Sequence, residues 1–330
     1  MIWVEFLFYS AIIVYSAIKL AEYGDVIAIR TRLGGMLIGI ILMAGATSLP
    51  ELLTTINAIS QGVPNLAAGN MFGSNMFNMF ILGAMGLINI RTRILRKVAR
   101  RHALTSALTI LMICLAIFFV LADLDIKIGW FGIDSTILIL TYILAILIIQ
   151  NDSHTAHEIA EAHEDEFEGI PSLAAGIMGF ALSTALLIIV MPALVSTSAE
   201  IAEITGLGTG FVGTSLVAIV TSLPELVTTI AAVRLGVYDM AVGNLFGSNM
   251  FNMFSLGISD VIMTNGLFIS VISDDFIIVG VLGLIMTAMG LVGNLAKLER
   301  KFIIFEIDAL ALIITYLLGM GLIYLRGIAI

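Results

Sequence analysis

Long apolar stretches separated by short polar breaks dominate this chain. An apolar run of about 18 or more residues is long enough to cross roughly 30 Å of hydrocarbon as a helix. The pattern predicts about ten such spans, near residues 2–22, 34–59, 66–90, 103–122, 132–150, 172–198, 208–233, 239–262, 274–294 and 303–325. Transmembrane β-strands would alternate apolar with polar residues, which these segments do not do. The sequence therefore predicts an all-α integral membrane protein.

The composition agrees with this fold class. The 330 residues are 60% hydrophobic and 12% charged, whereas an average soluble domain has roughly 25% charged residues. Cys114 is the only cysteine, so an intrachain disulfide and a thiolate metal cluster are both excluded. The N-terminal run has no basic leader, and we expect it to be the first span rather than a cleaved signal.

Most of the basic residues lie in loops that follow alternate spans. They are Arg30, Arg32, Arg91, Arg93, Arg96, Lys97, Arg100, Arg101, Arg234, Lys297, Arg300 and Lys301, with Arg326 as an exception. The positive-inside rule then predicts a multi-pass cell-membrane protein with both termini extracytoplasmic. The polar segment 151–170 becomes an acidic cytoplasmic linker, although its histidines and glutamates could instead form a regulatory cation site.

The chain also repeats itself. Residues 47–83 match residues 221–257 without a gap at 26 of 37 positions, within motifs at 45–83 and 219–257, and Ile133-Asp134 recurs as Ile307-Asp308. The repeat therefore covers two five-helix halves, 1–150 and 171–330. Five is an odd number, so the second copy enters the membrane from the opposite face and the copies are inverted. Inverted repeats are typical of secondary transporters, whose substrate site lies at the midplane between the copies.

Each copy places a proline and a glutamate inside a predicted span, at Pro50-Glu51 and Pro224-Glu225. Proline leaves a backbone carbonyl without its helical partner. A carboxylate at bilayer depth costs at least about 2.5–3.5 kcal/mol. A bound cation would offset both costs, whereas the alternative is a protonated carboxyl that only packs between helices.

Further oxygen-bearing side chains surround the two glutamates. They are Thr47, Ser48, Ser74 and Asn78 in the first copy and Thr221, Ser222, Ser248 and Asn252 in the second. The serines and asparagines lie four residues apart, which lines one helical face, where they could alternatively serve as interhelical hydrogen bonds. Two carboxylates with neutral oxygens suit Ca²⁺, with Mg²⁺ as an alternative, while softer metals would need histidine or cysteine. We expect Asn70, Asn75, Asn244 and Asn249 to pack or to support this site.

These motifs resemble the α-repeats of the cation/calcium exchanger superfamily, nearest to its sodium/calcium exchanger branch. The resemblance is carried by "TSLPE" at 47–51 and 221–225 and by "GNxFGSNMFN" at 69–78 and 243–252, and the spans around them cover nearly the whole chain. It implies a four-site diamond in which Na⁺ and Ca²⁺ compete, and a first span in each copy that moves against the remaining bundle. The ion ligands that it implies are Thr47, Ser48, Glu51, Ser74, Asn78, Thr221, Ser222, Glu225 and Ser248.

Asn252 departs from the family pattern, because several sodium/calcium exchangers have an aspartate there. Glu51 and Glu225 are then the only obvious midplane acids, so an H⁺-coupled exchanger of Ca²⁺ or another divalent cation is the alternative to a Na⁺/Ca²⁺ antiporter. Inverted repeats disfavour a passive cation channel. The chain lacks the residue sets of an intramembrane enzyme, and we expect no cofactor, nucleic acid or obligate protein partner besides the transported ions and the lipid bilayer.

Overall fold

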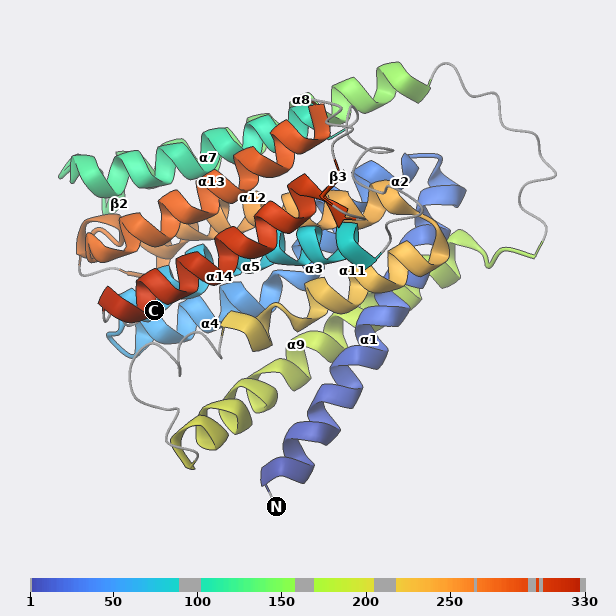
Figure 1. Ribbon diagram of the computed structural model, residues 1–330, viewed down its shortest axis with the longest axis horizontal. Helices are drawn as coiled ribbons and strands as arrows, with labels where there is room; N and C mark the ends of the chain where they lie inside the picture. Colours follow the sequence, from blue (N-terminus) through green and yellow to red (C-terminus); the bar gives the residue numbers. More distant parts are fainter. Residues whose placement is uncertain are drawn as a thin grey trace.

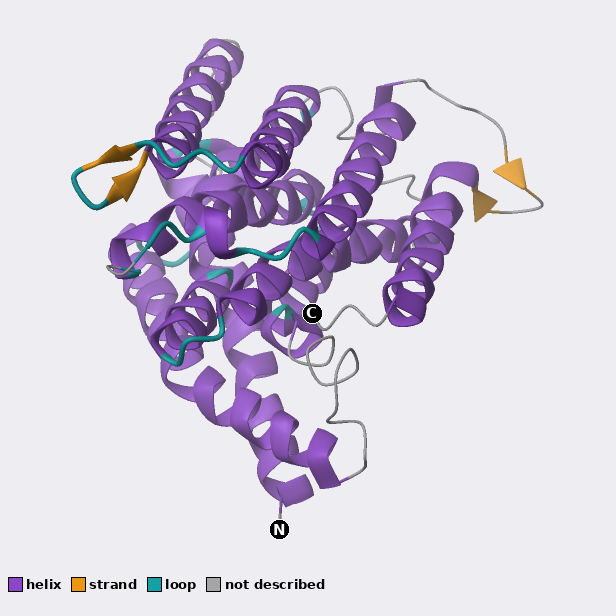
Figure 2. Ribbon diagram, turned by 90° about the vertical axis from the view of Figure 1, so that its left-hand side faces the viewer, coloured by secondary structure: helices purple, strands orange, loops and turns teal. Residues whose placement is uncertain are grey.

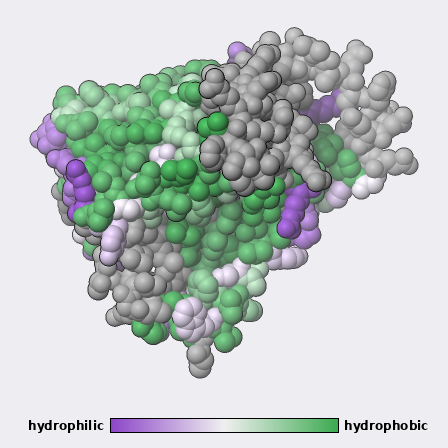
Figure 3. Space-filling model, viewed as in Figure 1, coloured by the Kyte–Doolittle hydropathy of each residue, from purple (hydrophilic) through white to green (hydrophobic). Residues whose placement is uncertain are grey.

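The computed structural model describes residues 2–88, 102–157, 169–204, 218–263, 266–295, 301–302 and 305–326. These residues form a bundle of long helices (Figures 1 and 2). Eight of the described helices are long and apolar enough to cross a membrane. Hydrophobic side chains also cover most of the described surface in Figure 3. The prediction of an all-α membrane protein is confirmed.

The first half of the chain begins with α1 (Ile2–Thr31) and a broken span. The broken span comprises α2 (Gly34–Leu37), the π-helix η1 (Ile38–Met43), α3 (Ala44–Thr47) and α4 (Leu49–Ser60). The half continues with α5 (Pro64–Ile88), α7 (Ala103–Ala122) and α8 (Ile133–His157). A short antiparallel hairpin of β1 (Lys127–Ile128) and β2 (Phe131–Gly132) precedes α8.

The second half repeats this order. It contains α9 (Leu173–Ile204), α11 (Leu223–Leu235), α12 (Tyr238–Ile262), the short 3₁₀-helix η3 (Ile269–Val271), α13 (Asp275–Leu295) and α14 (Ile307–Arg326). A second hairpin, β3 (Lys301–Phe302) with β4 (Phe305–Glu306), precedes α14. Both hairpins occupy the same place in their repeats, so the structural repeat extends well beyond the matching sequence motifs.

Helices α1 and α9, the first of each half, pack against each other along their lengths at one side of the bundle (Figure 1). The centre is occupied by α5 and α12, which pack on each other, while α12 also contacts α7, α8 and η1. Most side chains of α12 are buried, including its asparagines and serines. Polar groups in this helix therefore face protein, which explains why it is less apolar than the peripheral spans.

Glycines allow α12 to cross the broken span closely. A Cβ on Gly247 would lie 2.6 Å from the Ile40 carbonyl oxygen, and one on Gly243 would lie 2.9 Å from that of Met36. On the other side of this crossing, a Cβ on Gly39 would lie 2.4 Å from the Met240 carbonyl oxygen. A side chain at any of these positions would push the two backbones apart.

Several predicted boundaries change. The first span extends to Thr31 rather than ending near residue 22. The second half of the predicted span 208–233 is seen as α11, and residues 205–217 lie outside the described residues. So do the basic residues between 91 and 101, Lys297, Arg300 and most of the linker 151–170, including its glutamates.

Candidate cation site between the repeats

In each repeat, the helical span that contains the sequence "SLPE" is interrupted at the serine. Ser48 has φ −90° and ψ 0°, and Ser222 has φ −87° and ψ 10°. The helices α4 and α11 begin directly afterwards, with proline in the first turn, where its missing N–H has no intrahelical partner to lose. Each glutamate therefore lies in the first turn of a helix, where the helix dipole stabilises negative charge.

All of the predicted ligands are buried. The exposed fraction is 1% for Asn252 and 0% for Thr47, Ser48, Glu51, Ser74, Asn78, Thr221, Ser222, Glu225 and Ser248. Burial alone would also fit residues that only pack between helices, so their mutual contacts decide what the cluster can do.

Each repeat supplies a donor to the glutamate of the other. Ser48 Oγ donates to Glu225 Oε1 at 3.0 Å, and Ser222 Oγ donates to Glu51 Oε1 at 3.0 Å. The two bonds connect equivalent residues in opposite directions, as a two-fold relation between inverted copies requires. The structure thereby brings the two breaks and both carboxylates to one place.

The serines of α5 and α12 join the same cluster. Ser222 Oγ lies 3.0 Å from Ser74 Oγ, and Ser248 Oγ donates to Glu225 Oε1 at 3.4 Å. Thr47 Oγ1 lies 3.5 Å from Ser248 Oγ. The hydroxyls therefore link the breaks to the central helices.

Asn78 and Asn252 each form a hydrogen bond to an asparagine of the other repeat. Asn78 Nδ2 donates to Asn249 Oδ1 at 3.0 Å, and Asn252 Nδ2 donates to Asn75 Oδ1 at 3.0 Å. These bonds occupy the amide nitrogens and leave the two Oδ1 atoms of Asn78 and Asn252 without a partner. Asn75 and Asn249 thus orient the predicted ligands.

The asparagines near the starts of α5 and α12 hold the breaks in place. Asn70 Nδ2 donates to the Glu51 carbonyl oxygen at 3.2 Å, and Asn70 Oδ1 accepts from Thr221 Oγ1 at 3.1 Å. In the other copy, Asn244 Oδ1 accepts from Thr47 Oγ1 at 3.3 Å. Thr47 and Thr221 therefore use their hydroxyls in the supporting network as well.

Four buried oxygens in this cluster have no hydrogen-bond donor. They are Glu51 Oε2, Glu225 Oε2, Asn78 Oδ1 and Asn252 Oδ1. Buried acceptors without donors are costly unless a cation or proton satisfies them. Two carboxylates with amide and hydroxyl oxygens form the ligand chemistry of a hard cation. Among the described residues, no three His, Cys, Asp or Glu side chains gather as a metal-binding group, so the cluster offers two carboxylates and otherwise only neutral oxygens.

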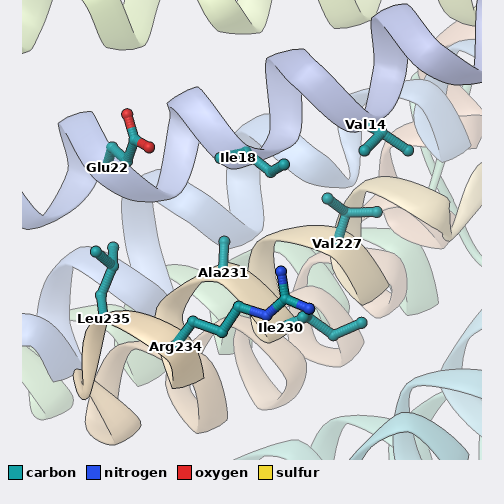
Figure 4. A pocket seen from close by; sticks show the side chains of 8 residues that line it. All are labelled: Val14, Ile18, Glu22, Val227, Ile230, Ala231, Arg234 and Leu235. Atoms are coloured by element: carbon teal, nitrogen blue, oxygen red, sulfur yellow. The ribbon is translucent and has the colours of Figure 1, made fainter.

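Two grooves flank the cluster at equivalent positions of the repeats. One, of ≈ 460 Å³, lies between α4 and α9 and is lined by Pro50, Leu53, Thr54, Asn57, Met191, Pro192, Val195 and Ser196. The other, of ≈ 320 Å³, lies between α1 and α11, and its lining is apolar except for Glu22 and Arg234 (Figure 4). α1 packs closely along α11, whereas α9 makes few contacts with α4. The α4–α9 groove, which reaches the residue next to Glu51, is the larger of the two by volume.

Comparison with known sequences identifies relatives along most of the chain. Residues 1–150 and 175–324 match the family described as "Sodium/calcium exchanger protein". The chain is 31% identical to the inner membrane protein YrbG of Escherichia coli over 253 residues, covering 73% of this chain and 74% of YrbG. It is 29% identical to the sodium/calcium exchanger MaX1 of Methanosarcina acetivorans over 271 residues, covering 71% and 75% of the two chains.

Solved structures share the fold. The sodium-calcium exchanger NCX_Mj, soaked with zero Na⁺ and Ca²⁺, matches with a TM-score of 0.72 and 19% identity over 97% of this chain and 98% of that one. The same protein soaked with 100 mM Na⁺ and 10 mM Sr²⁺ matches with a TM-score of 0.70 and 21% identity, over 97% and 99%. This likeness confirms the all-helical membrane fold.

Proposed function

Because this chain belongs to the sodium/calcium exchanger family, we propose that it exchanges Ca²⁺ for Na⁺ at a midplane site built on Glu51 and Glu225. Family membership makes it a membrane cation antiporter, and the proposal adds the ions and the residues. The observation that carries the proposal is the set of four buried oxygens without donors, contributed by both repeats.

The proposed divalent ligands are the free oxygens of Glu51 and Glu225, aided by Asn78 and Asn252. The hydroxyls of Thr47, Ser48, Ser74, Thr221, Ser222 and Ser248 complete a set that Na⁺ ions can share. Ca²⁺ and Na⁺ cannot both hold the same carboxylates, so binding is mutually exclusive. A loaded site has its buried charge neutralised, whereas an empty one holds two unpaired carboxylates and resists crossing the barrier. Exchange without leak follows.

The two grooves supply the alternating access. In the proposed mechanism the larger α4–α9 groove gives access to the site from the face that carries the turn at 61–63, and the smaller α1–α11 groove is the less accessible side. Movement of the α1–α9 pair against the bundle would make the α1–α11 groove the more accessible one and close the α4–α9 groove. The symmetry of the grooves supports this proposal, because each is lined by a first helix of one half and the "SLPE" helix of the other.

Proton coupling is the second candidate, favoured by one observation. Asn252 stands where an additional carboxylate would raise the negative charge of the site, and it is an amide with its nitrogen bonded to Asn75. If Glu51 and Glu225 are the only acids in the site, two protons bound to them would replace the two positive charges of a departing divalent cation.

The proposed topology has both termini extracytoplasmic and the 151–170 linker in the cytoplasm, joining the halves 1–150 and 171–330. Accessibility of a tag at each terminus to an impermeant protease in intact cells tests the orientation. Digestion of both tags is expected, and protection of both would reverse the assignment of the faces.

Uptake of ⁴⁵Ca²⁺ into proteoliposomes tests the exchange. An outwardly directed Na⁺ gradient is expected to drive uptake in the wild type and not in Glu51→Gln or Glu225→Gln. Uptake driven only by an H⁺ gradient would instead support the second candidate function, H⁺-coupled exchange. Uptake down a Ca²⁺ gradient with no counter-ion would contradict antiport altogether.

A further inference from the structure

A second pair of buried carboxylates lies away from the exchange site, at one end of the bundle. Asp134 is in the first turn of α8 and Asp260 is in the last turn of α12, and both are 0% exposed. Asp260 is eight residues beyond Asn252, which places it about 12 Å along the helix from the exchange site at 1.5 Å per residue.

The two carboxylates face each other across Gly132. The position of a Cβ on this glycine would lie 2.1 Å from Asp134 Oδ1 and 2.8 Å from Asp260 Oδ2. Gly132 therefore provides the space in which the two side chains meet, and a larger residue there would separate them.

Backbone N–H groups donate hydrogen bonds to both carboxylates and hold them in place, but they do not neutralise the negative charges. Asp260 accepts from the Gly132 N–H at 2.9 Å and from the Phe268 N–H at 2.5 Å, which ties the β1–β2 hairpin and the loop after α12 to the helix. Asp134 Oδ1 accepts from the Ser135 N–H at 2.7 Å. Asp134 Oδ2 and Ser135 Oγ are buried and have no hydrogen-bond partner.

The negative charge at this place has no described counter-charge. Lys127 of the adjoining hairpin is exposed and pairs with Asp125 at 3.1 Å. Asp260 also stands at the C-terminal end of α12, where the helix dipole disfavours an anion. Two buried carboxylates side by side require a cation or a proton to be stable.

We propose that Asp134 and Asp260 bind a divalent cation at this end of the bundle, with Ser135 Oγ as a further oxygen ligand. A divalent ion balances both charges, whereas a monovalent ion would leave one buried carboxylate unpaired. The oxygen-only ligands select a hard ion of the Ca²⁺ type. The bound ion would fasten the β1–β2 hairpin and the loop after α12 to the ends of α8 and α12.

The inverted repeat provides a matched control. Asp308 is the counterpart of Asp134 and likewise accepts from the next backbone N–H, of Ala309, at 3.0 Å. The residue at the position equivalent to Asp260 is Gly86, in the first half, so Asp308 has no carboxylate opposite it at that position. The proposed site therefore belongs to one end of the bundle only.

The test is ⁴⁵Ca²⁺ binding to purified full-length protein in nanodiscs, by equilibrium dialysis at millimolar Ca²⁺ and without Na⁺. The starting variant is Glu51→Gln/Glu225→Gln, which disables the exchange site and makes the result independent of the proposed function. We expect one Ca²⁺ per chain to remain, to be lost on adding Asp134→Asn, and to be retained on adding Asp308→Asn.

Binding of no Ca²⁺ by a folded, monodisperse Glu51→Gln/Glu225→Gln variant would overturn the proposal and indicate a pair that shares a proton. Retention of the ion after Asp134→Asn would overturn it as well. Should the combined variants fail to fold, the comparison is made with Asp134→Asn alone. It is then expected to bind one Ca²⁺ fewer than the wild type, and an equal number would overturn the site.

Discussion

Ser48 Oγ lies 3.0 Å from Glu225 Oε1, so the first repeat supplies a hydrogen bond to the carboxylate of the second. Ser222 does the same for Glu51 at an equal distance. The proposed exchange site is thus assembled from residues of both copies, and neither half of the chain carries the whole set.

Ser48→Ala and Ser222→Ala are expected to weaken apparent Ca²⁺ affinity by similar amounts, about ten- to hundredfold each. A hydrogen bond to a charged group contributes about 1.5–3 kcal/mol, and the two serines make equivalent bonds. The Ca²⁺ concentration for half-maximal ⁴⁵Ca²⁺ uptake measures the effect. Ser60→Ala is the control, since the exposed Ser60 hydroxyl bonds only to the Ile56 carbonyl in the same helix. A large effect of one serine and none of the other would contradict the two-fold site.

Asn252→Asp is expected to add one positive charge to the load carried in each cycle. Asn252 Oδ1 has no donor at present, and the Asn75 amide, whose nitrogen is also unpartnered, can rotate to donate to the new carboxylate. The measurement is ⁴⁵Ca²⁺ uptake at a series of membrane potentials set by K⁺ and valinomycin. A steeper voltage dependence than in the wild type is predicted, and an unchanged dependence would place residue 252 outside the ion site.

Gly247→Ala is expected to destabilise the protein, because its Cβ would lie 2.6 Å from the Ile40 backbone oxygen. Separation of α12 from the broken span should lower the melting temperature by several degrees, as a loss of roughly 1–3 kcal/mol predicts for overpacking. Thermal unfolding followed by tryptophan fluorescence is the measurement. Gly321→Ala in α14, with nothing within 4 Å of its Cβ, should leave stability unchanged or raise it. Equal melting temperatures for both variants would refute the close crossing.

A cysteine at position 57 should be reached by a thiol reagent that cannot cross the membrane, whereas one at its repeat counterpart, position 231, should not. Asn57 is exposed in the α4–α9 groove, and Ala231 is 7% exposed beneath α1. Both variants are made in a Cys114→Ala background, because Cys114 is itself exposed. Equal labelling from one face would contradict a site that is open to one side at a time.

Much of this architecture follows from the sequence because the repeat is so close. The duplicated proline and glutamate predict both the break in each span and the meeting of the two copies. The ends of the helices were harder to predict from the sequence, because α1 continues through polar residues to Thr31. An apolar run also cannot tell a π-helix from an α-helix, so η1 was missed.

Contacts between distant residues were the hardest to predict. No local pattern shows that Asn75 and Asn249 orient Asn252 and Asn78, because the partners are more than 170 positions apart. Asp260 was missed for the same reason. It has no counterpart in the other repeat, and only the fold brings it to Asp134.

The most direct test of the exchange site is anomalous scattering from crystals soaked in Sr²⁺, a heavier stand-in for Ca²⁺, at low and at high Na⁺. The account predicts a peak between Glu51 and Glu225 at about the 2.3–2.6 Å typical of Ca²⁺–oxygen bonds or slightly beyond, which high Na⁺ abolishes. A peak that contacts neither glutamate, or no Sr²⁺ between the repeats at low Na⁺, would contradict it.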